Sequence, residues 1–192
     1  MITSKKPSRA RQGTGATRRA AATPQTAHVL RSFTPERHDH RRCVSAALSK
    51  ADATCSASGL RLTPLRRRVL ELVWGSHTPV KAYDLLATLG KERHQAAPPT
   101  VYRALDFLLE AGLVHRIASL NAFVGCGEPG PGHSGQFLIC TVCGTVAELD
   151  EPQLSATIAA SAERLGFEVR RETIEIEGLC ADCRRGKRKS AE

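Results

Sequence analysis

Four cysteines in two C-x-x-C units constrain this chain more than any other feature of its sequence. Cys140 and Cys143 form the first unit, and Cys180 and Cys183 form the second, with 36 residues between the two units. Such units can place four thiolates tetrahedrally around one zinc ion, and that spacing leaves room for a strand, a helix and a strand. A closed tetrathiolate has no open coordination position, so we expect a structural zinc rather than a catalytic one.

Disulfides and redox-active C-x-x-C motifs are the alternatives. The seven cysteines do not pair evenly, and two redox motifs within one short unit would be unusual. The segment around these cysteines alternates strand-like and helix-like patterns. We expect strands near 137–139, 145–148 and 167–177, and a helix over 150–165 with Leu154, Ile158 and Leu165 facing inward. A unit this small buries little apolar surface, so a metal and a partner subunit would both help to stabilise it.

The preceding segment contains the start signals of several helices. Thr63-Pro64 and Thr78-Pro79 each read as a helix N-cap followed by proline at the first helical position. A third helix is expected from Pro98 to Ala111, with its apolar stripe on Val101, Leu105, Leu108 and Leu109. Two short extended runs follow, 113–117 and 122–124. Helices followed by a small hairpin are typical of a winged helix-turn-helix, so we predict an α+β protein that binds DNA.

Arg103 lies on the face of the third helix opposite its apolar stripe. A guanidinium in this position can form two parallel hydrogen bonds to guanine in the major groove. The simpler alternative is a surface arginine that touches only phosphate. We expect base reading.

The formal charge of +9 does not by itself indicate a basic DNA-binding face. Residues 1–35 hold seven Lys/Arg and no acid, and residues 184–192 hold five Lys/Arg and one acid, which leaves a net charge of −2 over residues 36–183. We expect both ends to be disordered basic tails that attract phosphate without specificity. No apolar segment is long enough to span a membrane, and no apolar signal region is seen, so we expect a soluble, cytoplasmic protein.

Four further side chains near the hairpin and the loop after it are candidate ligands of a second metal. They offer two imidazoles, one thiolate and one carboxylate, a mixture that suits tetrahedral zinc better than manganese or magnesium. Each also has a plain structural explanation as a packed, buried or solvated residue. The four are His115, Cys126, His133 and Glu148.

Three stretches together resemble the Fur family of metal-dependent bacterial repressors. They are RLTPLRRRVLELV, PPTVYRALDFLLEAGLVHRI and the paired C-x-x-C units, and the similarity covers roughly residues 43–183. The closest branch is the one that senses zinc, since PGHSGQFLIC holds a single histidine where iron sensors carry an HHDH-like run. The resemblance implies a homodimer, a structural zinc on the four paired cysteines and a regulatory zinc on His115, Cys126, His133 and Glu148. It also implies contacts of Tyr83, Thr100, Tyr102 and Arg103 with operator DNA.

The resulting hypothesis is a zinc-responsive repressor of zinc uptake genes that holds two zinc ions per chain and binds no small organic substrate. We expect a tail over 1–40, a winged-helix domain over 41–125, a dimerisation domain over 126–183 and a tail over 184–192. The alternatives are a family member that senses iron or peroxide and, in a different class, a C-x-x-C thiol oxidoreductase. A zinc hydrolase or deaminase is disfavoured, because neither H-E-x-x-H nor H-x-E with P-C-x-x-C occurs.

Overall fold

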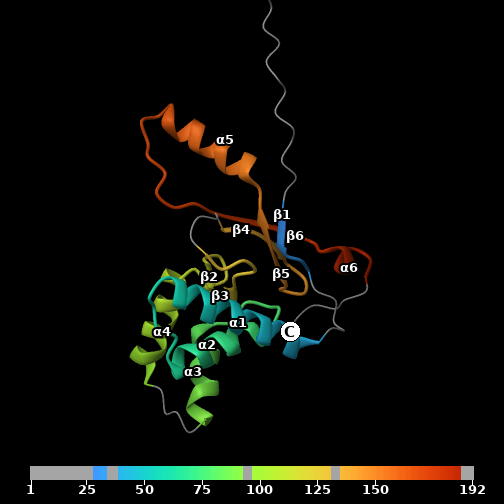
Figure 1. The fold of residues 1–192 in the computed structure, drawn as a ribbon. Helices are drawn as coiled ribbons and strands as arrows, with labels where there is room; N and C mark the ends of the chain where they lie inside the picture. The colour runs from blue at the N-terminus through green and yellow to red at the C-terminus, as the bar shows by residue number, and fades with distance from the viewer. Residues whose placement is uncertain (1–27, 34–38, 93–96, 131–134, 187–192) are drawn as a thin grey trace, which may run out of the picture.

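The computed structural model describes residues 28–33, 39–92, 97–130 and 135–186. Four helices and a two-stranded hairpin form one part of the molecule, and a four-stranded sheet with two further helices forms the other (Figure 1). This arrangement confirms the predicted α+β class. Within the described ranges, no helix is both long enough and apolar enough to cross a membrane.

The predicted helix starts at Thr63-Pro64 and Pro98 are confirmed, but the predicted start at Thr78-Pro79 is wrong. That helix begins at Ala82, because Val80 instead exchanges backbone hydrogen bonds with Phe123 of the hairpin. Thr63 caps α2 by accepting a hydrogen bond from the Arg66 backbone N–H at 3.5 Å, and prolines occupy the first turns of α2 and α4. The apolar stripes of the four helices meet in one core, which also receives Leu113, Val114 and Phe123 from the hairpin region. The helices are α1 (His40–Ala57), α2 (Pro64–Trp74), α3 (Ala82–Lys91) and α4 (Pro98–Glu110).

The hairpin of β2 (Val114–Ile117) and β3 (Ala122–Gly125) lies between the two parts of the molecule (Figure 1). Its turn places Asn121 at φ +46°, a left-handed conformation that asparagine tolerates better than most residues. One set of its side chains joins the helical core, while Ile117 and Val124 pack with residues of the sheet. The hairpin therefore belongs to both cores and couples them mechanically.

The four-stranded sheet has the strand order β1-β5-β4-β6. β4 pairs antiparallel with β5 and parallel with β6, and β1 pairs antiparallel with the free edge of β5. A short helix, α6 (Ala181–Arg184), follows β6. The strands are β1 (His28–Arg31), β4 (Gly135–Cys140), β5 (Val146–Asp150) and β6 (Thr173–Gly178).

Strand β1 corrects the expectation that residues 1–40 are a disordered tail. That expectation is wrong for His28–Arg31, because the exposed edge of β5 offers backbone hydrogen-bond partners to these residues. The expected tail over 184–192 also begins too early, since Arg184 is the last residue of α6. The remainder of that tail, residues 187–192, and residues 1–27 lie outside the described residues.

Helix α5 (Pro152–Glu163) stands away from helices α1–α4 (Figure 1), and none of its residues is buried within the chain. The prediction that Leu165 faces inward is wrong within this chain, since Leu165 follows the end of the helix at Glu163 and is 86% exposed. Leu154 and Ile158 are half-buried. This helix belongs to the small unit for which the sequence analysis expects a partner subunit.

Candidate metal centres and nucleic-acid interface

The four paired cysteines lie together at one end of the sheet. Cys140 is the last residue of β4, and Cys180 follows β6 and precedes α6. The parallel pairing of β4 with β6 puts Cys140 opposite Gly178, which brings the second C-x-x-C unit beside the first. The four sulfur atoms lie within 4.8 Å of one another, and Cys143 Sγ is 3.9 Å from Cys180 Sγ. None of the seven cysteines, all of which lie in the described ranges, forms a disulfide, so the disulfide alternative finds no support in this arrangement.

Backbone N–H groups favour the thiolate form of Cys140, whereas burial and the neighbouring cysteine side chains raise the pKa of Cys183. Burial raises the pKa of Cys140, but hydrogen bonds from the backbone N–H groups of Cys143, Cys180 and Val142 outweigh it and bring the pKa below its ordinary value. The Cys180 N–H donates to Cys140 Sγ at 3.4 Å, and the Cys183 N–H donates to Cys180 Sγ at 3.5 Å. Four converging sulfurs, two of which accept backbone N–H donors, are the donor set of a closed zinc knuckle.

A second cluster forms where the hairpin meets the sheet. His115 comes from β2, Cys126 follows β3, and Glu148 lies in β5. His115 Nε2 is 2.8 Å from Glu148 Oε1, and Cys126 Sγ is 3.8 Å from the same oxygen. The backbone N–H of Gly127 donates to Glu148 Oε2 at 2.8 Å. Three of the four predicted regulatory ligands thus converge, and their ligand atoms lie within 4.8 Å of one another. The fourth, His133, lies outside the described residues.

The electrostatics of this cluster favour a divalent cation. Glu148 is 1% exposed, so its charge has little access to water. Burial raises the pKa of the Cys126 thiol, and the neighbouring Glu148 carboxylate raises it further. A thiol in such a place ionises when a cation compensates the second negative charge. The mixed N, S and O donors fit zinc, as their chemistry alone indicated.

The four residues predicted to contact DNA lie on the surface formed by α3 and α4. Tyr83 is 78% exposed and Tyr102 is 50% exposed, and both line a hollow of about 300 Å³ beside the hairpin. Thr100 and Arg103 are exposed on the same helix as Tyr102. The opposite face of α4 is buried in the helical core. This places α4 as the exposed second helix of a helix-turn-helix pair, with its outer face available to a DNA groove.

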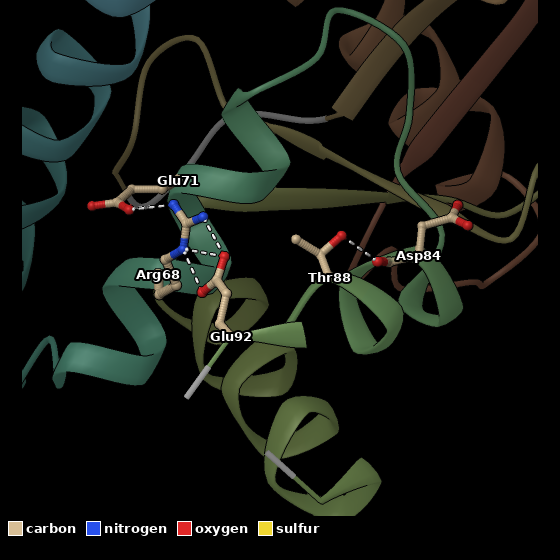
Figure 2. A network of polar contacts seen from close by, with 5 residues as sticks. All are labelled: Arg68, Glu71, Asp84, Thr88 and Glu92. Atoms are coloured by element: carbon tan, nitrogen blue, oxygen red, sulfur yellow. Dashed lines mark hydrogen bonds and ion pairs between the residues drawn. The ribbon is translucent and has the colours of Figure 1, made fainter. Parts of the chain in front are cut away.

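An ion-pair network that the sequence analysis missed holds α2 against the end of α3 (Figure 2). Arg68 donates to both carboxylate oxygens of Glu92, at 3.0 and 2.6 Å, and to Glu71 at 2.8 Å. These hydrogen bonds raise the pKa of Arg68 above its ordinary value. Figure 2 also shows Thr88 donating to the backbone oxygen of Asp84 within α3. The network fixes α3 relative to α2 just before the connection to α4.

The fold and the two clusters define a class of protein, a winged-helix DNA-binding protein with metal-ligand sites. The sequence profile of the Ferric uptake regulator family matches residues 57–177. The chain is 42% identical to the zinc uptake regulation protein of Escherichia coli (strain K12) over 137 residues, which is 71% of this chain and 80% of that protein. The chain belongs to the Ferric uptake regulator family.

Two solved structures are similar in both sequence and fold. A zinc uptake regulator in complex with zinc and DNA is 40% identical, with a TM-score of 0.70, over 75% of this chain and 97% of that one. The holo form of XcZur is 45% identical, with a TM-score of 0.68, over 73% of this chain and 98% of that one.

Proposed function

We propose that this chain is a zinc-responsive, DNA-binding transcriptional repressor, and that its targets include zinc uptake genes. The observation that carries the proposal is the convergence of His115, Cys126 and Glu148 at the junction of the hairpin and the sheet. The relatives named zinc uptake regulation protein, and the related regulator solved with zinc and DNA, support the same reading.

We call the cluster of His115, Cys126 and Glu148 the hinge cluster, because its residues come from both halves of the molecule. His115 and Cys126 move with the hairpin, which packs on the DNA-binding helices, while Glu148 belongs to the sheet. Bound zinc supplies a divalent charge that holds these ligands at fixed separations. His133 completes the proposed set. The orientation of α4 relative to the sheet is then restricted, which favours the DNA-competent arrangement by population shift.

We further propose that the chain acts as a homodimer with two zinc ions per chain. The four paired cysteines would hold the structural ion, and α5 with the outer face of the sheet would form the dimer contact. Leu165, Phe167 and Ile176 are apolar, exposed and close to that face, which supports this assignment. Two recognition helices related by twofold symmetry would read two half-sites of one operator.

The proposed roles on the DNA surface differ by residue. Arg103 would read a base, Tyr83 would add a contact from α3, and Thr100 and Tyr102 would contact the phosphate backbone. The domain boundary is proposed at residues 125/126, with β1 added to the dimerisation domain. The protein would act in the cytoplasm, where its DNA target lies, as a regulator rather than as an enzyme.

The experiment that tests this function is a titration of operator DNA binding against buffered free zinc. The purified dimer is titrated in parallel with iron and with manganese. Half-saturation at the lowest free concentration with zinc supports the proposal. Binding that follows iron or manganese would indicate a sensor of a different signal, and binding that no metal changes would remove the sensory role altogether.

A further inference from the structure

Strand β1 is a structural element that the proposed function leaves without a role. It lies before residue 57, where the match to the family profile begins. In the sheet, Val29 pairs with Leu149 and Arg31 pairs with Glu148, the carboxylate of the hinge cluster. A segment from the chain's basic N-terminal region thus lies directly alongside the strand that carries a proposed metal ligand.

The side chain of Arg31 crosses from the sheet to the DNA-binding half. Its Nη1 donates to the backbone oxygen of Gly125 at 3.3 Å, and its Nη2 donates to the backbone oxygen of His77 at 3.0 Å. The guanidinium carbon lies 5.7 Å from the centroid of the Trp74 ring. Arg31 therefore has its backbone in one half of the molecule and its hydrogen-bond acceptors in the other.

Burying the charged Arg31 side chain costs free energy, and packing alone does not explain why an arginine occupies this position. Burial lowers the pKa of Arg31, against the opposing effect of the Glu148 charge. Its Nε is buried and has no hydrogen-bond partner among the residues that the structure describes. An incompletely satisfied buried cation is costly, whereas an apolar side chain of similar length would avoid that cost. What Arg31 provides instead is a rigid fork that reaches two carbonyls at once.

The hinge segment, residues 125–127, is held on several sides. Arg31 binds the Gly125 carbonyl, Lys50 Nζ donates to the Gly127 carbonyl at 2.9 Å, and the Gly127 N–H donates to Glu148. A Cβ on Gly127 would lie 2.4 Å from the Leu30 oxygen, so β1 packs directly against this segment. Cys126, the thiol ligand, sits in the middle of the segment.

We propose that Arg31 is a positioning residue of the zinc sensor, through which β1 holds Cys126 in reach of Glu148 before zinc binds. The inference rests on the proposed function, and it adds an element that determines how much free zinc the sensor needs. If the ligands are already assembled in most molecules, ordering the hinge offsets little of the free energy of zinc binding. Loss of the Arg31 contacts lowers the competent fraction, and the apparent dissociation constant for zinc rises by the same factor.

Two substitutions at Arg31 separate this role from a general electrostatic one. Arg31→Met removes both hydrogen bonds and the charge, whereas Arg31→Lys keeps the charge and loses the two-pronged reach. Arg170→Met is the matched control, since the Arg170 side chain is 86% exposed and its Nε lies 4.0 Å from Glu168 Oε1. For Arg31→Met we expect the zinc midpoint for operator binding to move to about tenfold higher free zinc, the size of one charged hydrogen bond. Arg31→Lys should shift in the same direction, and Arg170→Met should match wild type.

A second readout does not depend on DNA or on zinc at the hinge. Amide hydrogen exchange is measured with zinc retained at the four cysteines and removed from the hinge by a mild chelator. We expect faster exchange over residues 123–127 in Arg31→Met than in wild type, with unchanged exchange in α2 and α4. General unfolding would instead raise exchange in those helices and would contradict a local positioning role.

The outcomes distinguish the inference from the proposed function. If wild-type protein shows no zinc dependence of DNA binding, the proposed function fails. If wild type responds to zinc and Arg31→Met has an unchanged or lower zinc midpoint, the inference about Arg31 is wrong while the function stands. An Arg31→Lys variant that equals wild type would show that charge alone matters, and it would overturn the role of the two-carbonyl contact.

Discussion

Glu148→Gln is the substitution that most selectively disables the hinge cluster. The side chain is 1% exposed and accepts from the Gly127 N–H at 2.8 Å, while its other oxygen lies 2.8 Å from His115 Nε2. Glutamine has nearly the same shape, so the site keeps its packing. It loses the negative charge, and its NH₂ group must face either Gly127 N–H or His115.

The size of the effect follows from what the carboxylate does in the cluster. Changes to residues that only orient metal ligands cost about 10–100-fold in metal affinity. Glu148 is itself a proposed ligand and also orients the Gly127 N–H beside Cys126. We therefore expect zinc affinity at the hinge to fall by about 100-fold or more, or about 2.8 kcal/mol.

The assay is competition for zinc with a chromophoric chelator, followed by operator binding at fixed free zinc. The control is Glu128→Gln, which makes the same change at an exposed carboxylate two residues beyond Cys126. The zinc held by the four cysteines should be retained in both variants. Wild-type hinge affinity in Glu148→Gln, or an equal loss in Glu128→Gln, would refute the assignment of Glu148 as a ligand.

Three further predictions address the other parts of the account. Cys140→Ser should reduce both the bound zinc and the dimerisation, because the free energy of metal binding contributes to folding in a small metal domain. Metal analysis measures the zinc and sedimentation measures the dimer. A variant that stays dimeric with unchanged zinc would contradict this prediction. Arg103→Ala should cost about 1–3 kcal/mol at the operator and much less on random DNA, and equal losses on both would leave only a phosphate contact. Glu175 links β6 to the hairpin turn by accepting from the backbone N–H groups of Ala118 and Ser119 at 2.6 and 3.0 Å. Burial raises the pKa of Glu175, but the Ser119 hydroxyl and these N–H groups outweigh it and hold the pKa below its usual value. The stabilisation from Glu175 is therefore present at neutral pH and lost as the pH falls through that lowered pKa. The free energies of unfolding in urea of wild type and Glu175→Gln should differ at neutral pH and converge in acid. A difference that stays constant with pH would contradict this.

The sequence predicted the elements whose signals are local. The Thr63-Pro64 cap marks the start of α2, and the stripe from Val101 to Leu109 falls within α4, because capping and helical periodicity act over a few residues. The paired C-x-x-C units were informative for a similar reason, since each unit is short and carries specific chemistry.

The contacts that were missed depend on pairings between distant residues. Strand β1 has only four residues inside a basic segment, and its hydrogen-bond partners in β5 lie more than a hundred positions away. Arg31 and Gly125 are separated by 94 residues, and Ala118 and Glu175 by 57. No periodicity in the sequence records such pairings. The exposure of Leu165 was missed because an apolar residue indicates burial. It does not indicate whether its own chain or a partner subunit buries it.

The central claim, that zinc at the hinge and DNA at α4 are coupled, is tested most directly by measuring zinc affinity with and without operator. Linkage requires that operator DNA tighten zinc binding by the same factor by which zinc tightens DNA binding. We expect the two factors to agree in wild type and both to fall to one in Cys126→Ser, with the dimer and its cysteine-bound zinc intact. Equal zinc affinity on and off the operator, or wild-type coupling in Cys126→Ser, would contradict the account.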